Sequence, residues 1–248
     1  MAARSAIVTG GGTGIGAAIA RRLSADGYAV AVMGRRAEVL DEVVGELSEG
    51  IAVTGDVGRP EDCERAVAAT VEAFGGVDAL VNNAGIGNVA TGLEETPEQW
   101  DHVLRINLSG AFYMARAALP HLIERRGAIV NISSTSGYVA GPGWTSYCTS
   151  KAGLIMLGRC LANDYGPAGV RANTVCPGWV RTPMGDEDMD VVAELGESTA
   201  RRHTASCTRT PRSAGRPRLT RSLRLSPSSS VRTRATSTVS HYRWTGAP

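Results

Sequence analysis

Tyr147 and Lys151 stand four residues apart in "YCTSK", and their side chains could together move a proton. Four residues span one turn of a helix, so both side chains would lie on the same face. A free phenol has a pKa of about 10, and a neighbouring ammonium lowers that value by favouring the phenolate. Each residue alone is better interpreted as a surface side chain. As a pair that includes the only lysine in the chain, they indicate acid–base catalysis.

A glycine-rich stretch near the N-terminus, "TGGGTGIG" at residues 9–16, is the second candidate for chemistry. It follows a strand-like run and opens a helical segment. Glycines let the backbone turn tightly and approach a pyrophosphate, whose charge is met by free N–H groups and the positive end of the helix dipole. A flexible turn is the alternative. The position between strand and helix favours dinucleotide binding.

Apolar, β-rich runs alternate along the chain with longer segments of helical period, which is typical of a parallel sheet covered on both faces. We therefore expect a single α/β domain with a Rossmann-like, doubly wound parallel sheet in the order 3-2-1-4-5-6. The expected strands are residues 5–10, 28–34, 51–57, 77–85, 127–134 and 170–178. The expected helices are residues 14–25, 37–47, 60–74, one long stretch at 96–126, and 146–166.

Several further motifs occur in a fixed order with "TGGGTGIG" and "YCTSK". They are "NNAG" at 82–85, "RIN" at 105–107, "NISS" at 131–134 and "CPG" at 176–178. With this set, the sequence from about residue 3 to 184 resembles the short-chain dehydrogenases/reductases. It is close in pattern to 3-oxoacyl carrier-protein reductases and polyketide ketoreductases.

The resemblance implies a role for four polar residues of these motifs. Tyr147 would donate the proton that a developing alkoxide needs when a hydride reduces a ketone. Lys151 would also bond the nicotinamide ribose, and Ser134 would hold the substrate carbonyl. Asn107 would keep a water that relays protons to Lys151. The alternatives are that Ser134 only caps the end of a strand and that Asn107 only bonds a neighbouring backbone group.

The end of the second strand, "MGRRAE", bears on the choice of cofactor. An acidic residue there would bond the adenosine ribose of NAD. Arg35 and Arg36 could instead pair with the 2′-phosphate of NADP, which favours NADP(H), with NAD(H) as the alternative. By analogy with the family, Asp56 would bond the adenine amino group. The expected cofactor-binding residues are Thr9, Gly10, Gly12, Thr13, Gly14, Ile15, Gly16, Arg35, Arg36, Asp56, Val57, Asn83, Ala84, Gly85, Tyr147, Lys151, Pro177, Gly178, Val180 and Thr182.

Three functions are compatible with these residues. The leading hypothesis is an NADPH-dependent reductase of a β-ketoacyl, polyketide or related ketone. The same residues would serve an alcohol dehydrogenase working oxidatively with NAD(P), and a third interpretation is a cofactor-binding sensor or scaffold with impaired catalysis. We expect a small-molecule or carrier-bound substrate and neither a nucleic acid nor a membrane as partner. The resemblance implies a homodimer or homotetramer.

Composition divides the 248-residue chain into two unequal parts. Residues 1–197 carry 15 basic and 24 acidic residues and form the expected NADP-binding domain. Residues 198–248, the basic tail, hold 11 arginines and no acid. The five cysteines show no spacing typical of zinc sites and are expected to be reduced thiols. Without a signal-like or membrane-spanning run, we expect a cytoplasmic protein.

The basic tail does not match the family, whose chains end in a pattern like "YVTG…LPVDGG". When residues 234–246, "RATSTVSHYRWTG", are written in GC-rich codons and read from the third base, they give "GYVDGVALPVDG". A basic arm that binds nucleic acid would explain the charge but not the missing last helix and strand. We therefore hypothesise that a frame slip near Gly196 replaced the native C-terminal segment with an atypical tail. We expect this tail to be disordered or poorly packed, which would also put the oligomer in doubt.

Overall fold

The structure is a computed structural model that describes residues 4–180 and residue 182. Six strands form one sheet in which every neighbouring pair is parallel. They are β1 (Arg4–Thr9), β2 (Tyr28–Gly34), β3 (Gly50–Thr54), β4 (Ala79–Asn82), β5 (Ala128–Ile132) and β6 (Arg171–Val175). Their order, β3-β2-β1-β4-β5-β6, confirms the predicted doubly wound sheet.

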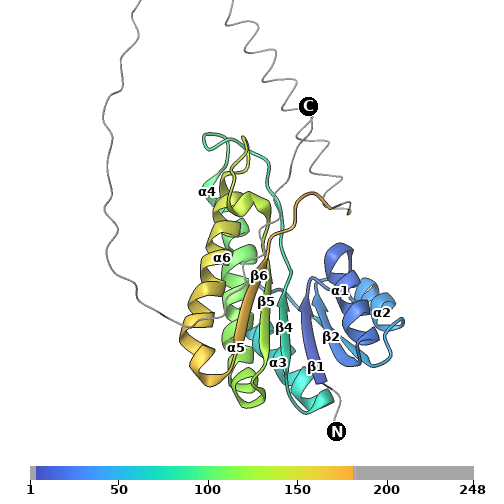
Figure 1. Ribbon diagram of the computed structural model, residues 1–248. Coiled ribbons are helices and arrows are strands. Elements are labelled where there is room, and N and C mark those ends of the chain that lie inside the picture. The colour runs from blue at the N-terminus through green and yellow to red at the C-terminus, as the bar shows by residue number, and fades with distance from the viewer. Residues whose placement is uncertain (1–3, 181, 183–248) are drawn as a thin grey trace, which may run out of the picture.

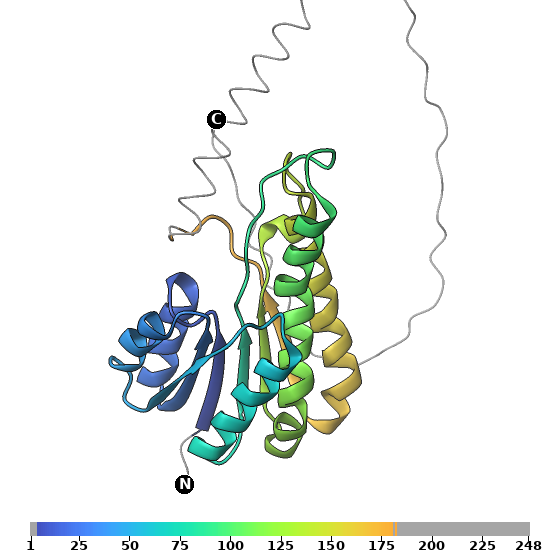
Figure 2. The same cartoon turned by 180° about the vertical axis from the view of Figure 1, so that it is seen from behind.

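Helices cover the two faces of this sheet (Figures 1 and 2). α1 (Gly14–Ala25) and α2 (Ala37–Val44) pack on one face. α3 (Pro60–Phe74), α5 (Gly110–Arg125) and α6 (Thr145–Tyr165) pack on the other. From β1 the chain adds β2 and β3 on one side of the sheet, and then β4, β5 and β6 on the other. In folds of this kind a ligand binds at the carboxyl ends of the two strands where the order reverses, here β1 and β4.

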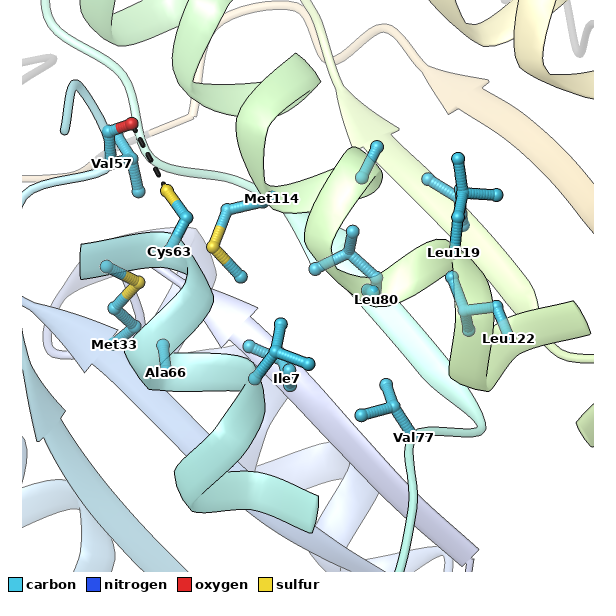
Figure 3. Packing of buried hydrophobic residues seen from close by; sticks show 14 of the residues in the cluster. Ile7, Met33, Val57, Cys63, Ala66, Val77, Leu80, Met114, Leu119 and Leu122 are labelled. Carbon is cyan, nitrogen blue, oxygen red and sulfur yellow. Dashed lines mark hydrogen bonds between the residues drawn. The ribbon is translucent and has the colours of Figure 1, made fainter. Parts of the chain in front are cut away.

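The larger of two apolar clusters lies between the sheet and α3, α5 and α6. Figure 3 shows Ile7, Met33 and Leu80 from three neighbouring strands facing Met114 of α5. Cys63 of α3 is fully buried in this cluster and donates to the Val57 carbonyl at 3.4 Å. Burial raises the pKa of the Cys63 thiol to about 12, so this thiol is a core group.

Two predicted helices differ from those in the structure. The helix expected at 37–47 ends at Val44, where Gly45 caps it and the next residues form tighter turns. The stretch expected as one helix at 96–126 is α4 (Pro97–Leu104), a π-helical turn (Arg105–Ser109) and α5. A π-helical turn inserts one residue into the helical repeat, and here it turns Asn107 into the interior.

Two shorter elements complete the description. Single 3₁₀ turns span Thr135–Gly137 and Gly166–Ala168. The predicted boundary between residues 197 and 198 and the whole basic tail lie outside the described residues.

Candidate active site

The turn between β1 and α1 is built from backbone that only glycine tolerates at key positions. Gly10 and Gly14 have φ values of +63° and +52°, in the left-handed region. A Cβ on Gly16 would overlap the Gly10 carbonyl oxygen and lie 2.5 Å from the Asn83 amide nitrogen. At the start of α1, the N-cap Thr13 makes no side-chain cap and the first turn holds no acid. The helix therefore presents N–H groups and a positive dipole end to this turn.

Polar contacts join this turn to the end of β4. The Thr9 hydroxyl accepts from the backbone N–H groups of Asn83 and Ala84, each at 3.0 Å. The Asn83 amide donates to the carbonyls of Thr9 at 3.0 Å and Gly10 at 3.2 Å. Thr9, Gly10, Asn83 and Ala84 thus form one rigid corner at the switch point of the sheet, where the sequence predicts a cofactor.

Tyr147 and Lys151 face each other in the first turns of α6, as their spacing predicts. The Lys151 Nζ atom lies 5.6 Å from the centroid of the Tyr147 ring. Lys151 is only 5% exposed and donates to the Ile132 carbonyl at the end of β5 at 3.0 Å. Burial lowers the pKa of Lys151 to about 8, because the charged ammonium loses its hydration. A Cβ on Gly85 would lie 3.3 Å from the same Nζ, so "NNAG" borders the pair.

Asn107 is buried and links the segment after β4 to α6. Its side-chain oxygen accepts from the Ile86 N–H at 2.8 Å, and its amide donates to the Ile86 carbonyl at 2.9 Å. The same amide donates to the Ser150 hydroxyl at 3.0 Å, and that hydroxyl donates to the Tyr147 carbonyl at 2.7 Å. The neighbouring-backbone role that the sequence left as an alternative is therefore present, and the water relay stays a prediction.

Ser134 lies two residues after the end of β5 and is half-buried. Its hydroxyl accepts from the Ser136 N–H at 3.1 Å and so caps the following 3₁₀ turn. The sequence left open a capping role at the end of a strand, and the structure shows a cap on the 3₁₀ turn that follows the strand. The Thr135 N–H donates to the Pro177 carbonyl at 2.9 Å, which ties this corner to the segment after β6. The role of Ser134 toward a substrate stays a prediction.

Arg35 and Arg36 follow β2 and are exposed. Among the described residues, neither guanidinium forms an ion pair. Asp56, after β3, accepts from the Gly58 N–H at 2.8 Å, and Val57 is buried against Gly110. These four predicted residues lie at the carboxyl ends of β2 and β3, on the β1 side of the switch point.

The segment after β6 crosses the start of α1. A Cβ on Gly14 would lie 3.1 Å from the Thr182 methyl group. A groove of about 490 Å³ is next to this contact and does not reach Tyr147. Its lining is mostly apolar and consists of Gly14, Ile15, Ala18, Ile19, Arg22, Leu23, Val180 and Thr182.

Two predicted glycines lie away from these contacts. Gly12 is farther along the β1–α1 turn, where a Cβ would lie 3.0 Å from the Val39 side chain of α2. A Cβ on Gly178 would meet no other described residue within 4 Å. The segment after β6 is therefore open on the side that Gly178 faces, as far as the described residues extend.

Three hydroxyl groups around Tyr147 and Lys151 are not among the predicted site residues. Ser133 donates to the Lys151 carbonyl at 2.8 Å, Ser150 bonds Tyr147 as described, and Ser146 bonds Glu95. All three serines are buried. Ser133 and Ser150 bond to backbone carbonyls of the "YCTSK" motif itself. Nothing in the local pattern distinguishes a serine with a distant partner from a surface serine. A contact between residues 95 and 146 arises only from the folded chain.

Comparison with known proteins places the chain among relatives of similar length and architecture. The model of the short chain dehydrogenase family matches residues 4–191. The chain is 44% identical over 196 residues to 2-(R)-hydroxypropyl-CoM dehydrogenase of Xanthobacter autotrophicus, covering 75% of this chain and 78% of that protein. It is 37% identical over 180 residues to meso-2,3-butanediol dehydrogenase of Serratia marcescens, covering 72% of each.

Solved structures give the same result. A crystal structure of a variant actinorhodin polyketide ketoreductase with NADPH superimposes with a TM-score of 0.76 at 37% identity, covering 79% of this chain and 78% of that one. A dehydrogenase/reductase from Sinorhizobium meliloti 1021 superimposes with a TM-score of 0.70 at 39% identity, covering 74% and 75% of the two chains. The motif order, the sheet and these matches agree: the chain belongs to the short chain dehydrogenase family and is an oxidoreductase acting on alcohol and carbonyl groups.

Proposed function

We propose that the protein is an NADPH-dependent reductase that converts a ketone to an alcohol, with Tyr147 as the proton donor. The observation that carries this proposal is the buried ammonium of Lys151, 5.6 Å from the Tyr147 ring. Among the described residues, no acidic group forms an ion pair with Lys151. Burying a lysine in this way is costly, so its place beside a phenol is best explained by chemistry. The similarity to a ketoreductase whose crystal structure contains NADPH supports the same interpretation.

The residues present fit a dinucleotide cofactor. The left-handed glycines and the uncapped start of α1 suit a pyrophosphate, and Arg35 and Arg36 suit a 2′-phosphate. Lys151 would bond the nicotinamide ribose. We also propose that the remaining cofactor-binding residues expected from the sequence contact the bound dinucleotide. When bound, the nicotinamide group supplies the hydride.

The side chains of the chain itself then handle the carbonyl oxygen and the proton. Ser134 would hold the carbonyl by donating a hydrogen bond. Tyr147 would donate its phenolic proton as negative charge develops on that oxygen. Lys151 is mostly charged at neutral pH, because its pKa is about 8, and it stabilises the phenolate that remains. The reverse sequence oxidises an alcohol, and the dehydrogenase names of the relatives favour this as the second candidate function.

A pair of tyrosine variants tests the proposal. NADPH consumption would be followed with the purified protein and a panel of β-keto esters, β-diketones and cyclic ketones. We expect turnover with at least one ketone and a loss of about 10³-fold or more in Tyr147→Phe. Tyr113→Phe, in α5, is the matched control and should retain activity. Binding of NADPH without turnover of any ketone or alcohol would instead support a sensor or scaffold.

Partners and location follow the resemblance and are also proposals. We propose a small-molecule or carrier-bound substrate, a homodimer or homotetramer, and a cytoplasmic location. In the part of the chain that the structure describes, no helix is both long and apolar enough to cross a bilayer. Light scattering coupled to size exclusion would give the oligomeric state directly.

A further inference from the structure

We propose that Glu95 is a positioning residue that caps the catalytic helix α6 from outside and so holds Tyr147 in place. The inference rests on the proposed function of Tyr147. It adds a residue that is 52 positions away from Tyr147 in the sequence and belongs to none of the motifs above. Four observations support it.

The first observation is that α6 lacks a cap of its own. Its N-cap is Trp144, which makes no side-chain cap, and the first turn contains no acidic residue. The first N–H groups of a helix have no partner within the helix, and an acidic group near them is favoured by the dipole. The helix that carries both Tyr147 and Lys151 thus needs an acceptor from elsewhere.

The second observation is that Glu95 supplies this acceptor. Its Oε2 atom accepts from the Ser146 backbone N–H at 3.2 Å, and its Oε1 atom accepts from the Ser146 hydroxyl. Ser146 is fully buried, so its hydroxyl relies on this partner. Ser146 immediately precedes Tyr147, and a shift of its backbone therefore moves the phenol.

The third observation is that Glu95 does not cap the neighbouring helix α4. Thr96, the N-cap residue of α4, forms a complete capping box, in which the Thr96 hydroxyl accepts from the Gln99 N–H at 3.2 Å and the Gln99 side chain accepts from the Thr96 N–H at 2.9 Å. The Glu95 carboxylate is directed instead to α6, and it also accepts from the Asn88 amide at 2.8 Å.

The fourth observation is that the whole segment 86–96 is fastened to the catalytic elements. At one end, Asn107 bonds both backbone groups of Ile86. In the middle, the Ala90 N–H donates to the Gly143 carbonyl at 2.9 Å. At the other end stands Glu95 on Ser146. This segment therefore sets the position of α6 relative to the end of β4, where "NNAG" borders Lys151.

The expected effect is on the chemical step. Proton donation requires the phenol within hydrogen-bond reach of the substrate oxygen, and a displacement of about 1 Å can cost about a hundredfold in rate. The glycine turn, Arg35 and Arg36 are contributed by β1, α1 and the end of β2, and on α6 the cofactor residue Lys151 lies one helical turn farther from Ser146 than Tyr147 does. Cofactor affinity should therefore depend on Glu95 much less than kcat does.

Four variants test the inference in the full chain: Glu95→Ala, Glu95→Gln, Ser146→Ala and Glu94→Ala. We expect Glu95→Ala to lower kcat by about 10- to 100-fold, with the dissociation constant of NADPH unchanged within about twofold. Glu95→Gln keeps one acceptor oxygen and should recover most of the loss. Ser146→Ala keeps the bond from the residue 146 N–H to Glu95, so its kcat should lie between those of the unchanged protein and Glu95→Ala. Glu94, an exposed acid that bonds Thr91 in the same segment, is the matched control and should change kcat less than about twofold.

Two further measurements separate positioning from general weakening. With deuterated NADPH, the primary isotope effect on kcat should rise in Glu95→Ala, because the chemical step becomes slower. Hydrogen exchange of the peptide that contains Ser146 and Tyr147 should be faster in Glu95→Ala than in Glu94→Ala. The exchange measurement does not need turnover, so it tests the cap even if no ketone is reduced and the proposed function fails.

Equal kcat in Glu95→Ala and Glu94→Ala would overturn the inference, and so would unchanged exchange at Ser146 and Tyr147. A fall in NADPH binding stoichiometry that parallels the loss of kcat would also overturn it, since that result means a smaller folded fraction. If Glu95→Ala does not fold, Ser146→Ala and Glu95→Gln carry the same comparison.

Discussion

Lys151 is the residue whose chemistry depends most on its surroundings. Its ammonium is covered by the end of β5 and by the "NNAG" corner, and burial lowers its pKa to about 8. The ordinary pKa of a lysine is about 10.4, so between these two values the unfolded chain binds more protons than the folded one. The cost of burying the charge is therefore largest below about pH 8 and disappears above the ordinary lysine pKa.

Activity should follow this titration. We expect kcat/KM for ketone reduction to fall as the pH rises past about 8, because the protein then loses the cation beside Tyr147. A pH profile of kcat/KM at saturating NADPH measures the midpoint. A profile that stays flat to pH 10 would show that Lys151 is not the group that titrates.

The free energy of unfolding should rise with pH in the range where activity falls, because the cost of burying the Lys151 charge disappears. In the absence of cofactor at pH 7, Lys151→Met should raise the free energy of unfolding by about 1–2 kcal/mol. The gain is smaller than the full cost of the buried charge, because the hydrogen bond to Ile132 is lost. Urea unfolding at pH 7 and at pH 10 checks the sign: the gain should shrink at the higher pH, and an equal gain at both would contradict the assignment.

Arg35 and Arg36 decide the cofactor in the proposed function. Both are exposed and make no ion pair among the described residues, so replacing them should not disturb the fold. We expect Arg35→Ser with Arg36→Ser to weaken NADPH binding by about 10- to 100-fold and NADH binding by less than about threefold. Fluorescence titration with the two cofactors gives both constants. Equal losses would mean that the arginines take no part in the choice.

At the scale of elements, the β1–α1 turn combines close packing with left-handed backbone that glycine adopts without strain. Gly16 brings α1 against the Gly10 carbonyl, and Asn83 closes the same corner from β4. The N–H groups at the start of α1 can therefore face a ligand only while the backbone at Gly16 stays packed against the Gly10 carbonyl.

An added methyl group tests this packing. Gly16→Ala should lower the free energy of unfolding by about 2–4 kcal/mol and abolish cofactor binding, because the methyl group meets backbone that cannot move aside. Gly45→Ala is the control: Gly45 has an ordinary helical φ of −58° and a Cβ there would have its nearest neighbours at 3.5 Å. It should change stability by less than about 1 kcal/mol. Similar losses in thermal unfolding for both variants would contradict this explanation.

At the scale of the whole molecule, the family match and the described residues end in the same region. The family model matches up to residue 191, and the relatives align with about three quarters of the chain. The basic tail at 198–248 has no acid and 11 arginines. The hypothesis of a frame slip near Gly196 thus concerns residues that lie outside the family match and outside the described residues.

Resequencing the gene tests the frame slip. We expect the DNA that encodes residues 234–246 to contain, in the neighbouring frame, codons for a segment like "GYVDGVALPVDG". An intact mass of the purified protein then shows which frame the cell uses. If the neighbouring frame encodes no such segment, the basic tail is the native C-terminal part and the hypothesis is wrong.

Local sequence determined much of this protein. The spacing of Tyr147 and Lys151, the alternation of strands and helices and the glycine turn depend on neighbours within a few residues, so the elements and the candidate site residues could be predicted. The sheet order followed from the doubly wound fold class that this alternation indicates. The break in the helix at Asn107 and the contact of Glu95 with Ser146 were decided only by the tertiary structure. Each of these brings together groups whose pairing or packing depends on the folded chain, and the pKa of Lys151 depends likewise on the strands that bury it.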